Sequence, residues 1–175
     1  MNIVLIGFRC AGKSTVGRIV SERLGMKFRD TDQLIQERAG MSIAEIVKTG
    51  GWTRFRRLEE VAVGLVSAEK DLVAATGGGV VTSGRNVRLL RDSGLVFWLR
   101  IGPETARIRM SRQEEASIRP AISGPSPIEE AGRVLKERDP LYHRAAHYRV
   151  DADLLDPEAA ACAVIEGFRK MKGVE

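Results

Sequence analysis

Residues 7–14 have the types and the spacing of a loop that binds phosphate. They read Gly-Phe-Arg-Cys-Ala-Gly-Lys-Ser, which matches the pattern G-x-x-x-x-G-K-[ST]. Backbone amides of such a loop, together with the N-terminus of the next helix, form a cradle for anions. An apolar run at residues 3–6 precedes the loop and a helical pattern follows it, which favours this interpretation over a chance glycine-rich turn. We therefore expect a bound nucleoside triphosphate, with Lys13 at its β- and γ-phosphates and Ser14 on Mg²⁺.

Two carboxylates, Asp30 and Asp32, follow the next short segment of the chain. In an extended chain, side chains two residues apart point the same way, so both can face the phosphate loop. They can hold a hydrated Mg²⁺ and orient an acceptor hydroxyl, because phosphoryl transfer needs positioning and charge neutralisation more than covalent help. The alternative is that Asp32 caps the helix that follows, and one residue can do both.

Arg56 and a run of three glycines are candidates for the acceptor side. Arg56 can bind an anionic group through two parallel hydrogen bonds, and Glu59, three residues on, can hold its guanidinium. An ordinary solvated ion pair is the alternative. Gly77, Gly78 and Gly79 follow a buried apolar run. Glycines there let a ligand approach the backbone closely, although a plain tight turn uses the same residues.

Two further arginines and two histidines carry weaker signals. Arg119 lies in a polar stretch, residues 111–125, and an arginine that closes over a transferring phosphoryl group is a known device. Arg138 ends a predicted helix and can be a second ligand for an acceptor anion. Taken alone, each is more simply a surface arginine. His143 and His147 have helical spacing without a third metal ligand nearby, so we interpret both as structural.

The elements that must position these residues alternate between apolar runs and helical patterns. Such alternation predicts an α/β protein with a parallel sheet covered on both faces, whose ligands bind beyond the carboxyl ends of the strands. The phosphate loop, the two aspartates and the glycines should therefore meet at one edge. We expect strands at 2–7, 72–75, 95–99 and 148–150, and helices at 13–24, 32–39, 42–48, 52–69, 84–92, from 103, at 126–138 and from 157.

Composition limits the class of protein. The 175 residues suit one well-filled domain. The net charge of +5 comes from scattered Lys and Arg without a long basic run, which favours a cleft for anionic ligands over nucleic-acid binding. Two cysteines form no metal or redox motif. No apolar stretch is long enough for a signal peptide or a membrane span, so we expect a cytoplasmic protein without nucleic-acid or membrane partners.

Two classes of phosphate-loop protein fit poorly. GTPases usually specify guanine with an N-K-x-D segment, but neither Asn2 nor Asn86 is followed by lysine. The chain is also too short for most motor cores. A small-molecule kinase is the class that remains.

Six segments, taken in order, resemble the shikimate kinase family. After the phosphate loop come D-T-D at 30–32, F-R-x-x-E at 55–59, G-G-G at 77–79, R-P at 119–120 and R-x-P-L-Y at 138–142. The resemblance implies a P-loop NTPase fold like that of nucleoside monophosphate kinases. It implies a five-stranded parallel sheet in a single domain over 1–175, a substrate-binding helical part near 31–60 and a lid near 110–123. It also implies a monomer that uses ATP to phosphorylate the 3-hydroxyl of shikimate, on the way to chorismate and aromatic amino acids.

The resemblance also implies roles for individual residues. Asp32 resembles the residue that holds the reacting hydroxyl and can act as base, and Arg56 and Arg138 resemble the ligands of the substrate carboxylate. Gly77, Gly78 and Gly79 resemble the wall around the substrate. Lys13 and Arg119 would neutralise the γ-phosphoryl group, and Mg²⁺ would be held by Ser14 and, through water, by Asp30. The residues that would bind ATP are Cys10, Ala11, Gly12, Lys13, Ser14, Thr15, Arg109, Arg119 and Pro157.

The chain departs from the family pattern in four places. Cys10 stands where glycine is usual, so its backbone either avoids positive φ or is strained. Trp52 stands where glutamate is usual, Val47 where an aromatic residue often lines the substrate pocket, and Ala121-Ile122 where two leucines are common. No charged contact is lost. The alternatives are a related kinase that acts on gluconate or a nucleotide, and a binding protein without catalysis, against which the intact charged residues argue.

Overall fold

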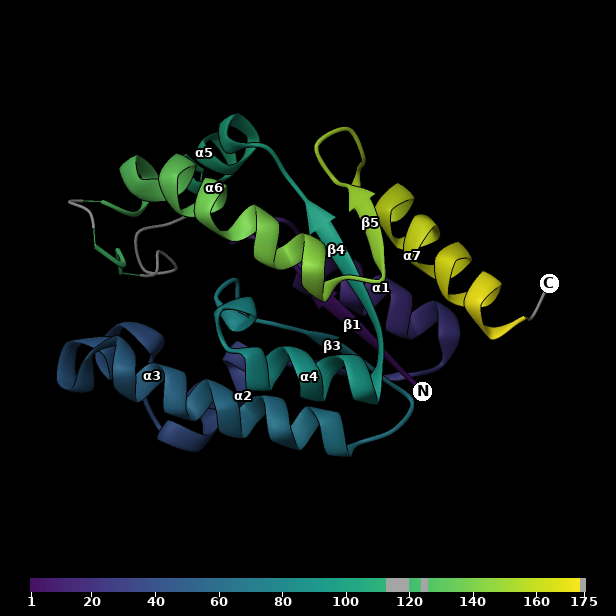
Figure 1. The fold of residues 1–175 in the computed structure, drawn as a ribbon, viewed down its shortest axis with the longest axis horizontal. Coiled ribbons are helices and arrows are strands. Elements are labelled where there is room, and N and C mark those ends of the chain that lie inside the picture. Colours follow the sequence, from purple (N-terminus) through teal and green to yellow (C-terminus); the bar gives the residue numbers. More distant parts are fainter. Residues whose placement is uncertain (113–119, 124–125, 174–175) are drawn as a thin grey trace.

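Five parallel strands form the centre of the molecule (Figure 1). The computed structural model describes residues 1–112, 120–123 and 126–173. The strands are β1 (Asn2–Ile6), β2 (Lys27–Asp30), β3 (Leu72–Ala75), β4 (Gly94–Arg100) and β5 (Tyr148–Asp151), in the spatial order β2-β3-β1-β4-β5. The predicted five-stranded parallel sheet is thus confirmed. Because β1 is the middle strand, the loop that follows it leaves the sheet at its centre.

β2 is the strand that the apolar pattern did not predict. It lies at an edge of the sheet, where Phe28 pairs with Val73 of β3. Its residues alternate between exposed and half-buried, whereas β3 is buried throughout. A strand with one neighbour and one wet side needs no continuous apolar run, which is why only the inner strands were visible as such runs.

Alternate residues of the inner strands enter two separate cores. On one face Ile3, Leu5 and Phe97 pack with α1 (Lys13–Leu24) and α7 (Pro157–Lys172). On the other face Val4 and Ile6 pack with α3 (Ile43–Ala68) and α4 (Gly84–Ser93). The remaining helices are α2 (Thr31–Ala39), η1 (Val80–Thr82), α5 (Pro103–Ser111) and α6 (Pro127–Ala145). Among the described residues, no helix is long and apolar enough to cross a membrane.

A third apolar cluster lies outside the sheet, within α2 and α3. It contains Ile35, Ile43, Ile46, Phe55 and Ala62. The predicted helices at 42–48 and 52–69 run together as α3, and Gly51 between them has non-helical backbone angles of φ 66° and ψ 179°. Ser42 begins the helix with a capping box in which Glu45 takes part. This cluster gives the segment its own packing beside the sheet.

The helix predicted to end near Arg138 continues for two more turns. Pro140 should stop it, because proline lacks an N–H and its ring crowds the carbonyl four residues earlier. Beyond Pro140, however, Tyr142 and Ala145 are buried against the sheet. Burial of this last part of α6 offsets the missing hydrogen bond, so packing overrides the local signal.

Candidate active site

A cavity of about 420 Å³ opens at the carboxyl ends of the central strands. The phosphate loop between β1 and α1 forms its floor, as the sequence predicted. Asp32 at the start of α2 and the glycine turn after β3 also reach it, so the topology brings three predicted segments together. Its lining residues are Arg9, Cys10, Gly12, Lys13, Ser14, Thr15, Asp32, Thr76, Gly78 and Arg109.

The side chain of Lys13 braces the phosphate loop from inside. Its Nζ donates hydrogen bonds to the carbonyl oxygens of Gly7, at 2.9 Å, and Phe8, at 2.7 Å. Gly7 has φ 148°, and a Cβ there would meet the Leu99 carbonyl oxygen, so only glycine fits. Cys10 has φ 62°, which decides between the two possibilities for this residue: it accepts the left-handed conformation that a glycine would adopt without strain.

Asp30 links the phosphate loop to α2. The Ser14 hydroxyl donates to its Oδ2 at 2.5 Å, and its Oδ1 accepts from the backbone N–H groups of Asp32, at 2.9 Å, and Gln33. Asp30 is therefore the cap of α2, and the suggestion that Asp32 caps this helix is wrong. The residue that precedes the helix extends the β2 strand and has the non-helical backbone that a cap requires. Asp32, the second residue of the helix, lines the cavity instead.

The Ser14–Asp30 contact fits the oxygen chemistry of a magnesium site. Mg²⁺ is usually held by one or two protein oxygens together with water and substrate phosphates, and here a hydroxyl and a carboxylate meet at the phosphate loop. Within the described parts of the chain, no group of three or more His, Cys, Asp and Glu residues could hold a metal by itself. The assignment of Ser14 and Asp30 to Mg²⁺ stays a prediction.

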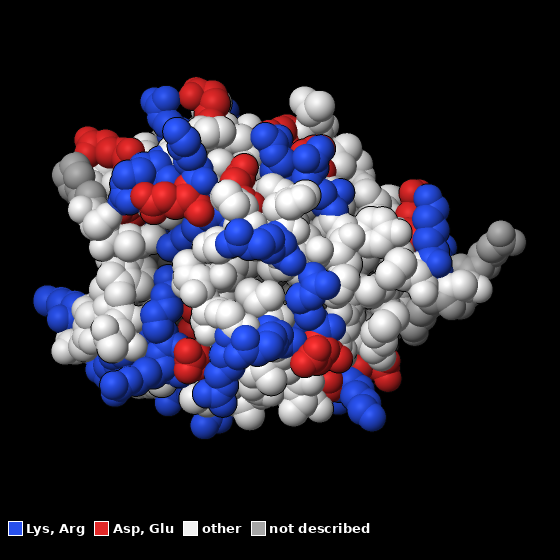
Figure 2. Space-filling model, viewed as in Figure 1, with Lys and Arg blue, Asp and Glu red and all other residues white. Residues whose placement is uncertain are grey.

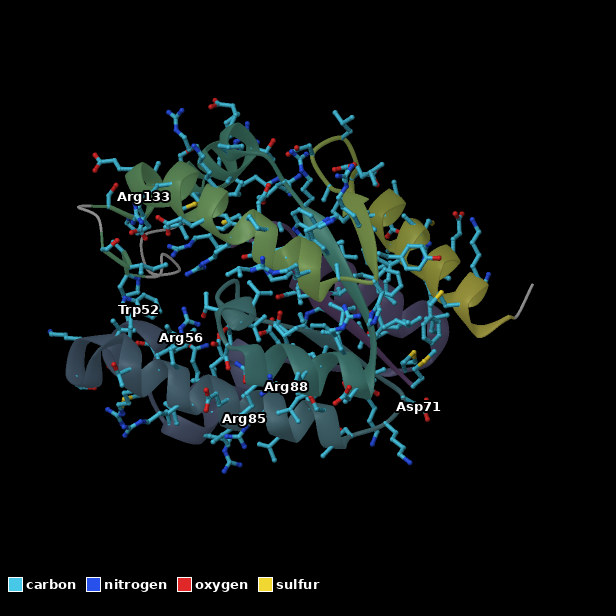
Figure 3. All side chains as sticks on the ribbon, viewed as in Figure 1. Trp52, Arg56, Asp71, Arg85, Arg88 and Arg133 are labelled. Carbon is cyan, nitrogen blue, oxygen red and sulfur yellow. The ribbon has the colours of Figure 1, made fainter. Side chains whose placement is uncertain are left out.

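Arg56 projects from the second half of α3 and is held on several sides (Figure 3). Its Nη1 donates to Glu59 Oε2 at 2.6 Å, and the Glu59 side chain is fully buried. Burial raises the pKa of the Glu59 carboxyl, and the Arg56 charge opposes that rise. The guanidinium also lies against Gly79, where any Cβ would collide with it. In the predicted Arg56–Glu59 pair the carboxylate is thus buried and the guanidinium half-buried, so it differs from an ordinary solvated pair.

The glycine turn is held by side chains from α6. Arg138 Nη1 and the Tyr142 hydroxyl both donate to the Gly78 carbonyl oxygen, at 3.1 and 2.5 Å. Complete burial raises the pKa of Tyr142 to about 12, so the phenol keeps its proton. From the other side, Thr31 accepts from the Gly77 N–H at 3.1 Å. Sequence reasoning missed Thr31 and Tyr142; the i, i+4 spacing of Arg138 and Tyr142 on α6 was the available signal.

Sequence reasoning also missed a second buried ion pair, which joins the phosphate loop to α6. Arg9 lines the cavity and lies 3.7 Å from Glu130, whose side chain is 2% exposed. Burial lowers the pKa of Arg9, and Glu130 opposes the shift. The Glu130 carboxylate also accepts hydrogen bonds from the backbone of Ile122 and Ser123. Nothing in the local pattern distinguished Glu130 from the surface acids on α6.

The remaining predicted residues differ in whether they line the cavity. Arg109 lines the cavity and donates to the carbonyl oxygens of Cys10, at 3.2 Å, and Ala152, at 2.9 Å. Pro157 is the first residue of α7 and does not line this cavity. Arg119 lies outside the described residues. His147 Nδ1 accepts from the Val96 N–H at 3.0 Å, which agrees with a structural role.

The charged residues around the site are mixed in sign at the surface. Figure 2 shows Lys and Arg interspersed with Asp and Glu on the face that it displays, without one continuous basic surface. The excess of arginine is instead partly internal, since Arg138 is buried and the Arg9 side chain is 13% exposed. Cations enclosed beside a phosphate loop favour small anionic ligands.

The fold and the site define the class of protein. A parallel sheet with a G-x-x-x-x-G-K-S loop after its middle strand is a P-loop NTPase fold. Beside that loop the same cavity is lined by Asp32, Gly78 and two arginines, Arg9 and Arg109. A phosphate loop that shares a cavity with a carboxylate and fixed cations is the arrangement of a small-molecule kinase.

Comparison with known proteins identifies the particular family. The family model for shikimate kinase matches residues 9–169. The shikimate kinase of Oleidesulfovibrio alaskensis is 43% identical over 86% of this chain and 87% of its own length. That of Moorella thermoacetica is 43% identical over 96% of this chain and 94% of its own. The structure of shikimate kinase from Acinetobacter baumannii in complex with shikimate matches with a TM-score of 0.84 and 33% identity, covering 98% of this chain and 93% of that one. The chain belongs to the shikimate kinase family.

Proposed function

We propose that the protein transfers the γ-phosphoryl group of ATP to the 3-hydroxyl of shikimate. The observation that carries this proposal is the cavity that joins the phosphate loop to Asp32 and to the glycine turn flanked by Arg56 and Arg138. In the reaction the hydroxyl oxygen forms a bond to the γ-phosphorus, and the bond from that phosphorus to the bridging β-phosphate oxygen breaks. The products are shikimate 3-phosphate and ADP, and the hydroxyl proton leaves to a base.

On the donor side the chain supplies a cradle of backbone N–H groups and fixed charge. Residues Cys10–Thr15 surround the phosphates, and Lys13, which already spans the loop, neutralises the transferring group. Arg109 lies beside the loop and is proposed to contact the nucleotide, together with Pro157 and Arg119. Ser14 and, through water, Asp30 would hold Mg²⁺, which supplies charge neutralisation at the β- and γ-phosphates.

On the acceptor side the two arginines bind the carboxylate of the substrate, and Asp32 orients its hydroxyl. Arg56, fixed by Glu59, and Arg138, fixed on Gly78, are proposed to hold the carboxylate of shikimate. Asp32 lines the same cavity and accepts the hydroxyl proton as the hydroxyl oxygen attacks. Gly77–Gly79 leave room for the ring beside the backbone. Two bound ends fix the reacting hydroxyl in line with the phosphoryl group, which supplies much of the rate.

We further propose that the protein works as a monomer in the cytoplasm, with the segment near 31–60 as its acceptor-binding part and residues near 110–123 as a lid. The interspersed surface charges in Figure 2 argue against a nucleic-acid partner. ATP and a small hydroxy acid are cytoplasmic metabolites, which supports the compartment.

The test is a coupled assay of ADP release with alternative acceptors. We expect turnover with shikimate and much less with gluconate or a nucleoside monophosphate. The rigid ring of shikimate holds its hydroxyl at a fixed distance from its carboxylate, whereas gluconate is a flexible chain that must be ordered on binding and a nucleoside monophosphate has no carboxylate. Preference for gluconate or for a nucleotide would contradict the proposal. Tight ATP binding without turnover on any acceptor would instead support a binding protein without catalysis.

A further inference from the structure

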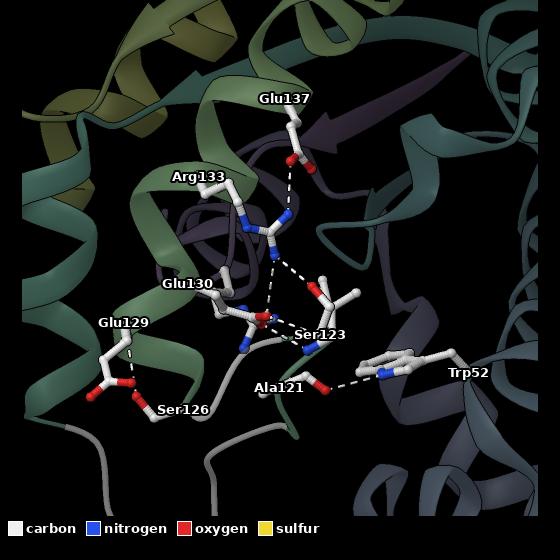
Figure 4. A network of polar contacts seen from close by, with 10 residues as sticks. Trp52, Ala121, Ser123, Ser126, Glu129, Glu130, Arg133 and Glu137 are labelled. Atoms are coloured by element: carbon white, nitrogen blue, oxygen red, sulfur yellow. Dashed lines mark hydrogen bonds and ion pairs between the residues drawn. The ribbon is translucent and has the colours of Figure 1, made fainter.

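Residues 121–123, here called the return segment, are held from two sides of the cleft (Figure 4). From α3, Trp52 Nε1 donates to the Ala121 carbonyl oxygen at 3.2 Å. From α6, Glu130 accepts from the N–H groups of Ile122, at 2.8 Å, and Ser123, at 3.0 Å. The segment therefore ties the helical part near the acceptor site to the helix that carries Arg138.

The same indole that holds the return segment also lies beside Arg56. The Arg56 Cζ is 5.6 Å from the centroid of the Trp52 ring, within the range of a cation–π contact. The opposite neighbour of the indole is Phe55, edge to face, with the ring centroids 5.5 Å apart. Figure 3 shows Trp52 and Arg56 on the same end of α3. One ring thus contacts both a proposed ligand of the acceptor and the far side of the cleft.

The remaining contacts of Arg56 come from Glu59, Gly79 and Phe55. Glu59 accepts a hydrogen bond from one guanidinium nitrogen, and the guanidinium lies against the Gly79 backbone. The Arg56 Cζ is also 5.3 Å from the centroid of the Phe55 ring, so two neighbouring aromatic rings contact the same guanidinium. The indole packs against the apolar cluster of α2 and α3, and its N–H bond to Ala121 is the contact that sets how the ring is turned within that packing.

We propose that Trp52 is a positioning residue, which fixes Arg56 against the acceptor carboxylate by holding its own N–H on the return segment. It acts through Arg56 rather than on the reacting atoms, so it sets acceptor affinity and leaves nucleotide affinity alone. The proposal rests on the proposed function, since it needs an acceptor with a carboxylate.

The test is Trp52→Phe, which keeps an aromatic ring beside Arg56 and removes the N–H. We expect the KM for shikimate to rise about three- to tenfold, the range that one ordinary hydrogen bond contributes. The KM for ATP should not change, and the melting temperature should fall by about 2–4 °C, because the same hydrogen bond is present in the unliganded fold. Val61→Ala is the control: Val61 is exposed on the same helix, so its substitution should leave the KM for shikimate unchanged. An unchanged KM for shikimate in Trp52→Phe, or an equal rise for ATP, would overturn the proposal.

A double-mutant cycle separates action through the return segment from loss of local packing. Glu130→Gln removes the charge that holds the other side of the segment, so the Trp52→Phe effect on the shikimate KM should be smaller in that background. Fold-changes that multiply would overturn the route through the segment. Failure of the wild-type protein to phosphorylate shikimate would overturn the proposed function itself, whereas normal wild-type turnover with an insensitive Trp52→Phe would overturn only this inference.

Discussion

The Asp30 side chain has two roles, and single substitutions can separate them. One oxygen accepts the Ser14 hydroxyl and the other caps α2. Asparagine is as good a cap as aspartate, but alanine loses about 1 kcal/mol of helix stability. The charge matters only for the proposed Mg²⁺ role, because a neutral amide supports neither a hydrated cation nor the ordering of its water.

We expect Asp30→Asn to have the stability of the wild type. The Mg²⁺ concentration needed for half-maximal activity should rise by about tenfold or more, the usual loss when an outer ligand is removed. Asp30→Ala should show the same Mg²⁺ requirement and be less stable as well. Activity titrated against Mg²⁺, with thermal unfolding of each variant, measures both effects. An unchanged Mg²⁺ requirement in Asp30→Asn would show that Asp30 is only a cap.

The residues that sequence reasoning could find are those whose role is local. The phosphate loop, the Arg56–Glu59 spacing and the glycine turn are short patterns with their own chemistry. Glu130 and Tyr142 are different: each is surrounded by ordinary helical sequence and gains its role only when α6 packs over the sheet. Long-range contacts of this kind leave no signature in spacing.

At the scale of elements, the kink in α3 positions the acceptor site. Gly51 adopts φ 66° and ψ 179°, a backbone conformation open essentially to glycine alone. The helix resumes at Trp52, and Arg56 and Glu59 follow on the redirected part. Substitution by alanine should therefore have opposite effects on stability at Gly51 and at Gly64. Gly64 lies in regular helix with open space around its Cβ position.

Gly51→Ala should lower the free energy of unfolding by roughly 1–3 kcal/mol and raise the KM for shikimate, because Trp52 and Arg56 are turned away from their partners. Gly64→Ala should instead raise the free energy of unfolding by about 0.5–1 kcal/mol without affecting the KM. Denaturant unfolding and steady-state kinetics of the two variants give the comparison. If Gly51→Ala were as stable and as active as the wild type, the kink would have no part in positioning the site.

At the scale of the whole molecule, the inner strands and most helices could be predicted from the sequence because their apolar patterns are strong. The edge strand β2 and the last turns of α6 could not. In β2 only one side is covered, and in α6 the burial of Tyr142 overrides the stop signal of Pro140. The positions of α2 and α3 relative to the phosphate loop likewise depend on packing, whose partners are distant in sequence.

Because separate apolar clusters support the two sides of the cavity, ligand binding on the two sides should be separable. α1, which begins at Lys13, packs in one core, whereas Phe55 beside Arg56 belongs to the cluster of α2 and α3. A ligand at 100 times its Kd adds about 2.7 kcal/mol to folding stability. For a chain of this length that corresponds to a rise of about 5–10 °C in melting temperature. We expect both shikimate and a non-hydrolysable ATP analogue with Mg²⁺ to produce such a rise in the wild type.

Arg56→Ala removes one of the two cations proposed for the acceptor side and leaves every described contact of the phosphate loop in place. Its melting temperature without ligand should fall, because Glu59 then lies buried without its partner, at a cost of about 3 kcal/mol or more for a broken buried pair. The rise with the ATP analogue should persist at the wild-type size, and the rise with shikimate should vanish. Differential scanning fluorimetry with each ligand measures all three quantities on one sample. Loss of the nucleotide-induced rise in Arg56→Ala would mean that Arg56 serves the donor side, and the division of the cavity into donor and acceptor sides would have to be reversed.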